Sequence, residues 1–410
     1  MLFTLAILAL YRLGDYIPVP GIPFHDFASA FSNSGVSMAM LDLFSGGALS
    51  NFSVFSLGIM PYITASIIMQ LMQAVIPAVG NWMREGETGR KKLTQTTRYL
   101  TLCLGLINAI GYLLLFKSAA YGVTFSSEVP ELLSDIMVVF TLVAGTAFIM
   151  WMGELITQRG VGNGMSLIIF ISIVSRVPSA IYSSISESST DFGMSVAITV
   201  LVFLVVLVCI PLIIYVERAQ RRIPVKYAKS VSGRRMMGGQ STYIPLKVNA
   251  AGVIPIIFAS CIIYFPAQLA AIFNVDWLTA FSDAISTGWI NWILTLVLIV
   301  FFAYFYTSMV FNPEETASNI QKQGGFIPGI RPGRATVDYI HNIIRRITLP
   351  GGLFIAAIAV IPTIIFFFTG NDLVKAFGGT SILIMIGVAL DTMTKVESQL
   401  KMYNYDGFFK

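Results

Sequence analysis

The chain has 410 residues, of which 56% are hydrophobic and 11% are charged, and its net charge is +5. Soluble domains carry about 25% charged residues, so this composition excludes an ordinary soluble protein and indicates that lipid is the main solvent. Two histidines and three cysteines leave little material for metal or redox chemistry. Because the cysteines lie in apolar runs, we predict no disulfide framework, no metal site and no cofactor.

Ten apolar runs follow one another along the chain, and each approaches the length of about 20 residues that a membrane-spanning helix needs. The first run lacks a basic start and a small-residue cleavage site, so we interpret it as a span and not as a signal peptide. The runs predict an all-α polytopic membrane protein. Their approximate ranges are 1–17, 56–77, 99–117, 133–154, 164–182, 194–216, 250–270, 289–311, 347–369 and 377–393.

Positive charges are concentrated in alternate connecting segments. The segments 78–98, 155–163, 217–249 and 312–346, together with the tail from residue 394, hold 22 of the 26 Lys and Arg residues. The positive-inside rule places this set in the cytosol, together with both termini. A wrong number of spans would scramble this alternation, so the charge pattern also supports ten.

A Ser-rich segment at 183–193 separates the fifth apolar run from the sixth. It divides the chain into an N-terminal half, 1–187, and a C-terminal half, 188–410, with five spans each. Because five is odd, the second half would cross the membrane inverted relative to the first. Inverted repeats build central pathways in many transport proteins. The two halves show no convincing sequence identity, so this symmetry is predicted from topology alone.

Two of the basic segments are longer than a simple connection requires. Segment 217–249 contains two strand-like pieces, RIPVKYAKSV and STYIPLKV, on either side of the basic tip SGRRMMGG. Segment 312–346 contains the turn GFIPGIRPGR, in which Pro and Gly would present Arg331 and Arg334 outward. These charges either anchor the membrane orientation or form docking arms for a polyanion such as ribosomal RNA, or for an acidic protein surface; their length favours docking.

The motifs of common enzymes are missing from the sequence. GETGRKK has the wrong spacing for a phosphate-binding loop, and no HExxH is present, so we predict that the chain is not an enzyme. Charges inside the spans are few and lie near span ends: Arg12, Asp15, Glu154 and Asp391. Ion-coupled carriers usually keep such groups near the bilayer midplane, so this placement disfavours a coupled carrier.

Eight motifs, collinear and spread over nearly the whole chain, resemble those of the SecY family, the channel-forming subunits of the bacterial protein-conducting translocon. They are FSGGALSNFSVFSLGIMPYITASII, EGETGRKKLTQTTRY, GVGNGMSLIIF, VERAQRRIPVKYAK, STYIPLKVNAAGVIP, FNPEETASNI, FIPGIRPG and FGGTSILI. The resemblance implies ten transmembrane helices in two inverted pseudo-symmetric halves around a central hourglass channel. It also implies a plug, a lateral gate and a location in the bacterial cytoplasmic (inner) membrane.

The resemblance also assigns roles to particular residues of this chain. A short plug helix at about 46–55 would include Gly46, Gly47, Ala48, Leu49, Ser50, Asn51, Phe52 and Ser53. A pore ring would comprise Ile59, Ile63, Met165, Ile169, Ile257 and Ile384, with Met165 in place of the usual isoleucine. The lateral gate would include Thr64, Gln70 and Asn108, and the face 253–265 of the seventh span. Docking of the ribosome or the motor would use Arg234, Arg235, Arg331 and Arg334.

The function implied by the resemblance is a channel that passes unfolded secretory polypeptides across the membrane and releases hydrophobic segments sideways into lipid. The implied partners are the membrane subunits SecE and SecG, the motor ATPase SecA, the ribosome, signal peptides, nascent chains and membrane lipid. The main alternative is a small-solute secondary transporter built from inverted repeats. A membrane-embedded enzyme is a second alternative, for which no clustered catalytic set is evident.

Overall fold

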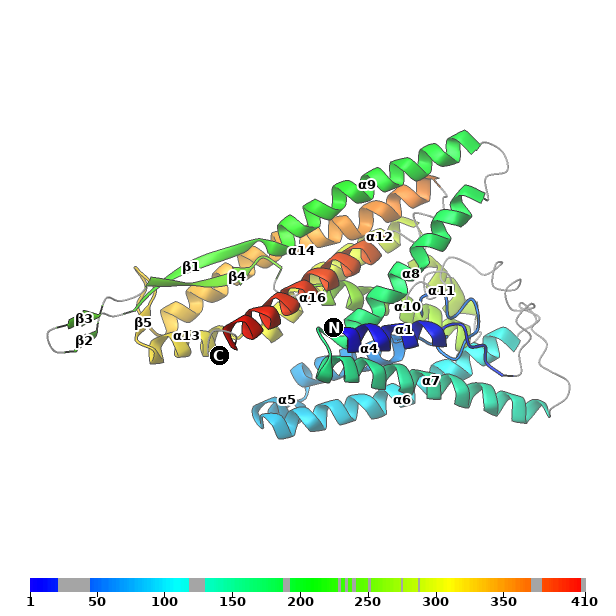
Figure 1. The fold of residues 1–410 in the computed structure, drawn as a ribbon, viewed down its shortest axis with the longest axis horizontal. Helices are drawn as coiled ribbons and strands as arrows, with labels where there is room; N and C mark the ends of the chain where they lie inside the picture. The colour runs from blue at the N-terminus through cyan, green and yellow to red at the C-terminus, as the bar shows by residue number, and fades with distance from the viewer. Residues whose placement is uncertain are drawn as a thin grey trace.

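The structure is a computed structural model, and it describes residues 1–20, 45–117, 130–186, 192–227, 230–232, 235–237, 241–249, 252–273, 276–286, 288–369 and 378–406. Helices dominate it (Figure 1). The helices are α1 (Leu2–Gly14), α4 (Met60–Val75), α5 (Pro77–Arg84), α6 (Glu87–Lys117), α7 (Glu131–Arg159), α8 (Gly164–Ser186), α9 (Phe192–Arg218), α10 (Ile254–Phe273), α11 (Asp276–Ser286), α12 (Gly288–Val310), α13 (Pro313–Lys322), α14 (Arg334–Thr369) and α16 (Gly379–Asp406). The strands are β1 (Gln220–Tyr227), β2 (Ser230–Ser232), β3 (Arg235–Met237), β4 (Ser241–Lys247) and β5 (Gly325–Phe326).

Each of the ten predicted spans has an apolar helix at its position in the described part of the chain: α1, α4, α6, α7, α8, α9, α10, α12, α14 and α16. Within the described residues, five helical stretches are long and apolar enough to cross a membrane. They are Glu87–Leu114, Leu132–Arg159, Gly288–Lys322, Arg334–Pro362 and Gly379–Lys401. Shorter apolar stretches lie at Leu2–Gly14, Met60–Val75, Gly164–Ser179 and Ile254–Ile263.

The largest hydrophobic core forms where helices from both ends of the chain meet. Its buried members come from α1, α4, α7, α8, α9, α10, α12, α14 and α16. Many of its side chains are β-branched isoleucines, which pack with little loss of rotamer freedom. Helix α16 packs against α8, α9, α10 and α14, so the end of the chain contacts helices from both predicted halves.

The two long basic segments fold together outside this core. Strands β1 and β4 form the antiparallel hairpin predicted from RIPVKYAKSV and STYIPLKV, with Ile223 opposite Ile244. The short strand β5 pairs with the other edge of β1 and completes a sheet of order β4-β1-β5. The hairpin extends from the end of α9, and β5, α13 and the first part of α14 lie beside it (Figure 1).

The segment expected to form a plug helix has a different local structure. Residues 46–58 form a succession of turns and not the short helix predicted for 46–55. Gly46, Gly47 and Gly58 have positive φ angles of 72°, 93° and 55°, a conformation that interrupts a right-handed helix. Phe52 also has a positive φ, of 41°, which is uncommon for a bulky residue. The left-handed positions therefore explain why the predicted helix is absent.

Candidate functional site

The six side chains assigned to a pore ring lie in one hydrophobic cluster. Five of them are buried, and Ile257 is partly buried against the same cluster. They come from widely separated parts of the sequence: Ile59 and Ile63 from the start of α4, Met165 and Ile169 from α8, Ile257 from α10 and Ile384 from α16. This placement is consistent with a common constriction. The cluster also contains many residues that are not assigned to the ring.

Glycines bring the helices that carry the ring close together. A Cβ atom on Gly153 of α7 would lie 2.3 Å from the sulfur of Met165, and one on Gly164 would lie 1.9 Å from the carbonyl oxygen of Gly153. A larger residue at Gly164 would require a shift of the backbone, whereas one at Gly153 would displace the Met165 side chain. The start of α8 is therefore held against α7, and this contact fixes the place of the flexible Met165 side chain.

The turn segment, residues 45–58, leads directly into the ring and shares its core. Ala48 and Phe55 belong to the same cluster as Ile59. The hydroxyl of Ser56 donates to the carbonyl oxygens of Ala48, at 3.0 Å, and Ser53. The Ser56 side chain thus satisfies buried backbone carbonyl groups that a helix would have paired within its own backbone.

The turn segment is seated against α1 and α7. Its backbone pairs with the chain that follows α1, through Val19 N donating to Phe52 O and Val54 N donating to Ile17 O. The ring of Phe55 stacks on Tyr11 with centroids 5.7 Å apart. Close packing at this seat depends on glycine: a Cβ on Gly14 or Gly145 would lie 2.0 Å from an atom of the segment.

Sequence reasoning did not assign a role to Arg12, which bonds directly to this segment. Its guanidinium donates to the carbonyl oxygen of Gly46, at 2.8 Å, and to Oδ2 of Asp15, at 3.0 Å. It also donates to the hydroxyl of Tyr16. The signal available in the sequence was an Arg followed three residues later by an Asp at the end of an apolar run.

Helix α8 forms the other wall of the seat. The hydroxyls of Tyr11 and Ser172 are 2.8 Å apart, and Ser172 donates its own proton to Ile168 O, so Tyr11 is the donor of the pair. A Cβ on Gly46 would lie 3.0 Å from Cα of Ser172. The turn segment therefore lies against α1, α7 and α8 through a mixture of apolar and polar contacts.

The three predicted gate residues lie on helices that face α10. Helix α10 packs against both α4 and α6. Thr64, Gln70 and Asn108 are each partly buried. Thr64 donates to Met60 O and Gln70 donates to Ser66 Oγ, so these two bonds stay within α4. Among the described residues, Oε1 of Gln70 is buried without a hydrogen-bond partner, which weakens the packing of this region.

Two of the four predicted docking residues, Arg331 and Arg334, lie on a small folded unit with its own core. Its buried residues come from both long basic segments: Ile223, Val225, Leu246, Ile320, Ile327 and Ile340. Arg331 and Arg334 are exposed beside turns at Gly329 and Gly333, which have φ angles of 85° and 108°. Arg235 begins β3, and Arg234 lies outside the described residues. The unit thus presents Arg331 and Arg334 on a rigid base.

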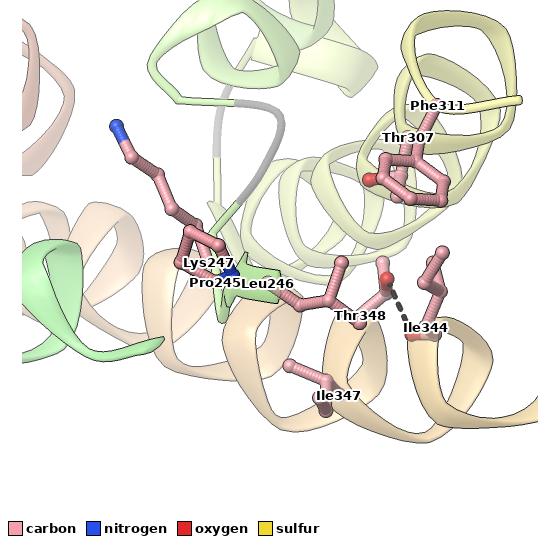
Figure 2. Close-up of a pocket in the computed structure, with 8 residues that line it drawn as sticks. All are labelled: Pro245, Leu246, Lys247, Thr307, Phe311, Ile344, Ile347 and Thr348. Atoms are coloured by element: carbon pink, nitrogen blue, oxygen red, sulfur yellow. Dashed lines mark hydrogen bonds between the residues drawn. The ribbon is translucent and has the colours of Figure 1, made fainter. Parts of the chain in front are cut away.

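A cavity of about 230 Å³ lies where this unit meets the helices (Figure 2). Its lining is mostly apolar and comes from β4, α12 and α14: Pro245, Leu246, Lys247, Thr307, Phe311, Ile344, Ile347 and Thr348. The hydroxyl of Thr348 donates to Ile344 O, and that of Thr307 donates to Ala303 O, so both lining hydroxyls already donate within their own helices. None of the predicted ring residues lines it.

The site therefore combines a large hydrophobic cluster, to which four helices contribute the six residues assigned to the ring, with an exposed basic unit. No group of His, Cys, Asp and Glu suited to a metal ion occurs among the described residues. The fold and the apolar helices define a multi-pass helical membrane protein. The SecY family model matches residues 53–393. The chain belongs to the SecY family.

Relatives and solved structures agree with this assignment. The protein translocase subunit SecY of Streptomyces coelicolor is 47% identical over 430 residues, covering 100% of this chain and 96% of that protein. A structure reported for the plug domain of the SecY protein has a TM-score of 0.64 at 16% identity, covering 97% of this chain and 91% of that one. Sec61 in a canine ribosome-channel complex has a TM-score of 0.57 at 16% identity, with the same coverages.

Proposed function

We propose that this chain is the channel-forming subunit of a protein translocase, which passes unfolded polypeptides across a membrane. The observation that supports the proposal is that the six side chains assigned to the ring, from α4, α8, α10 and α16, belong to the same hydrophobic cluster as residues of the turn segment. Membership of the SecY family supports the same function, since the relatives are named as translocase subunits.

An apolar constriction suits a cargo of any sequence. Aliphatic side chains offer no charge or hydrogen bond, so no cargo residue is held. When the constriction is closed, it excludes water and ions by dewetting. We infer that the six ring residues form this constriction and that the turn segment 45–58 is the plug that covers it when no cargo is present.

Sideways exit would occur between α4 and α6 on one side and α10 and α12 on the other. An apolar cargo helix with ten leucines gains about 3–6 kcal/mol on entering lipid, whereas a polar segment gains nothing there. The partly buried polar residues Thr64, Gln70 and Asn108 keep the closed seam only modestly stable. Partitioning at the seam thus sorts membrane segments from secreted ones.

Topology and partners follow the same proposal. The segments 217–249 and 312–346 face the cytosol of a bacterium with both termini, and residues 1–187 and 188–410 form two inverted halves in its inner membrane. Ten helices span that membrane around an hourglass-shaped channel. The basic unit receives the ribosome or the motor SecA, and SecE and SecG complete the membrane complex. The relation of Sec61 to a ribosome in a solved complex supports the ribosome as a partner.

The deciding experiment is reconstitution of the purified complex in vesicles with a secretory precursor. Precursor that becomes protected from added protease only when motor and ATP are present would support the channel. A small-solute transporter, which the family assignment does not favour, would leave the precursor fully digested while still moving a solute. A precursor that stays digested with an intact complex and an active motor would contradict the proposal.

A further inference from the structure

The outward residues of helix α11 whose side chains the structure describes are all apolar. The helix joins the end of α10 to the start of α12, at the end of these helices opposite to the basic hairpin (Figure 1). Its exposed residues are Trp277, Ala280, Phe281 and Ala284, which share one face of a helix at spacings of three and four. Trp277 is 69% exposed and Phe281 is 50% exposed.

The inward face of the same helix identifies which side packs on the protein. Leu278 and Ile285 are partly buried, and Ser282 is 5% exposed. These residues follow a spacing of four and three on the side of the helix next to Phe281. Helix α11 contacts both α10 and α12. A helix in water would place polar residues outward, whereas the described outward residues of α11 are apolar and Ser282 is buried.

The exposed apolar face continues onto α12. Trp289, Ile290, Ile293 and Val297 are exposed along the first part of that helix, and α12 belongs to a stretch apolar enough to cross a membrane. The outward face of α11 is thus an extension of a surface that lipid covers. Its aromatic residues lie at the end of that surface, where Trp and Tyr are enriched at the membrane–water boundary.

We propose that α11 lies in the interfacial layer of the lipid bilayer and anchors the end of α10 there. The occupant of its apolar face is lipid, at the level of the headgroups and the first methylenes, because a helix with this pattern binds in the plane of the interface. The proposal rests on the membrane orientation of α10 and α12 in the proposed function and does not require translocation itself.

The anchor would act on the proposed lateral gate. Helix α10 faces α4 and α6, and α11 follows it after two residues outside the described part of the chain. A helix held at the interface fixes the depth of the end of α10 while its other end moves. Gate opening would then depend on the lipid composition of the leaflet that contacts α11.

Single-tryptophan fluorescence in vesicles tests the position of α11. The reporter chain keeps Trp277 and carries Phe at Trp82, Trp151, Trp289 and Trp292. Lipids brominated near the headgroup should quench Trp277 several-fold more strongly than lipids brominated near the chain ends, and aqueous iodide should quench it weakly. Strong iodide quenching would place α11 in water and overturn the proposal.

Two other outcomes would also overturn it. Weak quenching by every agent would mean that a protein surface covers the face, and stronger quenching by the deep bromines would place α11 in the hydrocarbon core. If the reporter chain fails to fold, Trp277→Phe alone in the native chain gives the same comparison, because the shallow quenching lost with this one substitution is the contribution of Trp277.

Two reference positions separate this proposal from the proposed membrane orientation. In a tryptophan-free chain, Phe301→Trp reports the middle of α12, where the side chain is exposed, and deep bromines should quench it if α12 spans the bilayer. Tyr243→Trp reports β4 on the basic unit and should respond only to iodide. Failure of the Phe301→Trp reference would contradict the orientation, whereas failure of Trp277 alone would contradict the interfacial anchor.

Discussion

Arg12 links the end of α1 to the turn segment through a single carbonyl oxygen. The guanidinium lies 5.0 Å from the centre of the Tyr16 ring and forms an ion pair with Asp15, whose side chain is almost fully buried. These neighbours fix the direction in which Arg12 donates to Gly46 O. Because hydrogen bonds from charged groups are the stronger ones, Arg12 holds the first residues of the proposed plug.

Substitution of Arg12 by Gln should loosen the plug. A hydrogen bond to a charged group contributes about 1.5–3 kcal/mol, so the displaced state should become about 10- to 100-fold more populated. The increase would be measured as ion leak through the idle channel in a planar bilayer. Arg12→Lys, which keeps the charge but not the planar donor, should leak less than Arg12→Gln. An Arg12→Gln channel as tight as the native one would contradict this role.

Gly145 allows α7 to approach the turn segment. Its substitution should therefore loosen the proposed plug, as Arg12→Gln should. A Cβ on Gly145 would lie 2.0 Å from the carbonyl oxygen of Val54, so Gly145→Ala must move the segment or the helix. We expect a loss of about 1–3 kcal/mol in stability, measured by thermal unfolding, together with increased ion leak.

Gly105 on α6 provides the matched control. Its added Cβ would lie 3.8 Å from the Thr146 side chain, which is an ordinary contact. Gly105→Ala should therefore be neutral or should stabilise the helix by up to about 1 kcal/mol. Equal effects of the two substitutions on stability and ion leak would contradict a role for the close approach of α7 to the turn segment at Gly145.

At the level of secondary structure, local sequence signals predicted most of what the structure contains. Apolar runs predicted the positions of the long helices, because a helix that crosses a membrane needs a continuous apolar stretch. The strand-like pieces RIPVKYAKSV and STYIPLKV correspond to β1 and β4. Helix α13 begins after Asn312, whose side chain accepts from the amides of Glu314 and Glu315. These features depend on neighbours in the sequence.

The elements that were not predicted depend on distant contacts. Strand β5 has two residues and exists because it pairs with Lys226 and Tyr227, about a hundred residues earlier. The proposed plug was expected to be helical from the family resemblance, whereas Gly46 and Gly47 adopt left-handed conformations. The bond from Arg12 to Gly46 O joins residues 34 apart, so the local pairing of Arg12 with Asp15 does not indicate it.

The core of the basic unit can be tested separately from the helices. Val225 is completely buried between segments 217–249 and 312–346. Val225→Asp would bury an unpaired charge, which is strongly unfavourable, so both segments should become accessible to protease while the membrane-embedded fragments stay intact. Lys226→Asp, at an exposed neighbouring position, should leave the digestion pattern unchanged. Equal digestion of the two variants would mean that the shared core does not hold the unit together.

At the level of the whole molecule, the ring exists only when four distant helices have assembled. The resemblance to a known family supplied its six residues, since each alone is an ordinary apolar residue of a span. The structure places all six in one cluster. Their role as a constriction remains a prediction, because a closed apolar ring and an ordinary core have the same packing.

Substitution within the ring should separate these two possibilities. Ile384 and Ile299 are both completely buried in the same cluster, but only Ile384 is assigned to the ring. Ile384→Asn should raise ion conductance in a planar bilayer, because a polar side chain favours wetting of the constriction. Ile299→Asn, a comparable disturbance on α12, should destabilise the protein without raising conductance. Equal conductance of the two variants would contradict the ring.

Docking at the basic unit should depend on the positions of its charges and not only on their number. Arg331→Glu should reduce motor-driven export of a precursor while the membrane complex stays assembled, since the exposed turn would then repel an acidic partner. Lys322→Glu reverses a charge that is also exposed, at the end of α13, and should reduce export less. Normal export by Arg331→Glu would remove this residue from the docking surface.

The shared core of the basic unit also sets an order of events during synthesis. Ile223 and Val225 are made early, but the residues that cover them, from Ile320 to Ile340, leave the ribosome only about a hundred residues later. Until then the hairpin has an unpaired strand edge and an uncovered apolar face. During synthesis the hairpin is therefore accessible to chaperones and proteases for a limited time, which ends when the first part of α14 has been made.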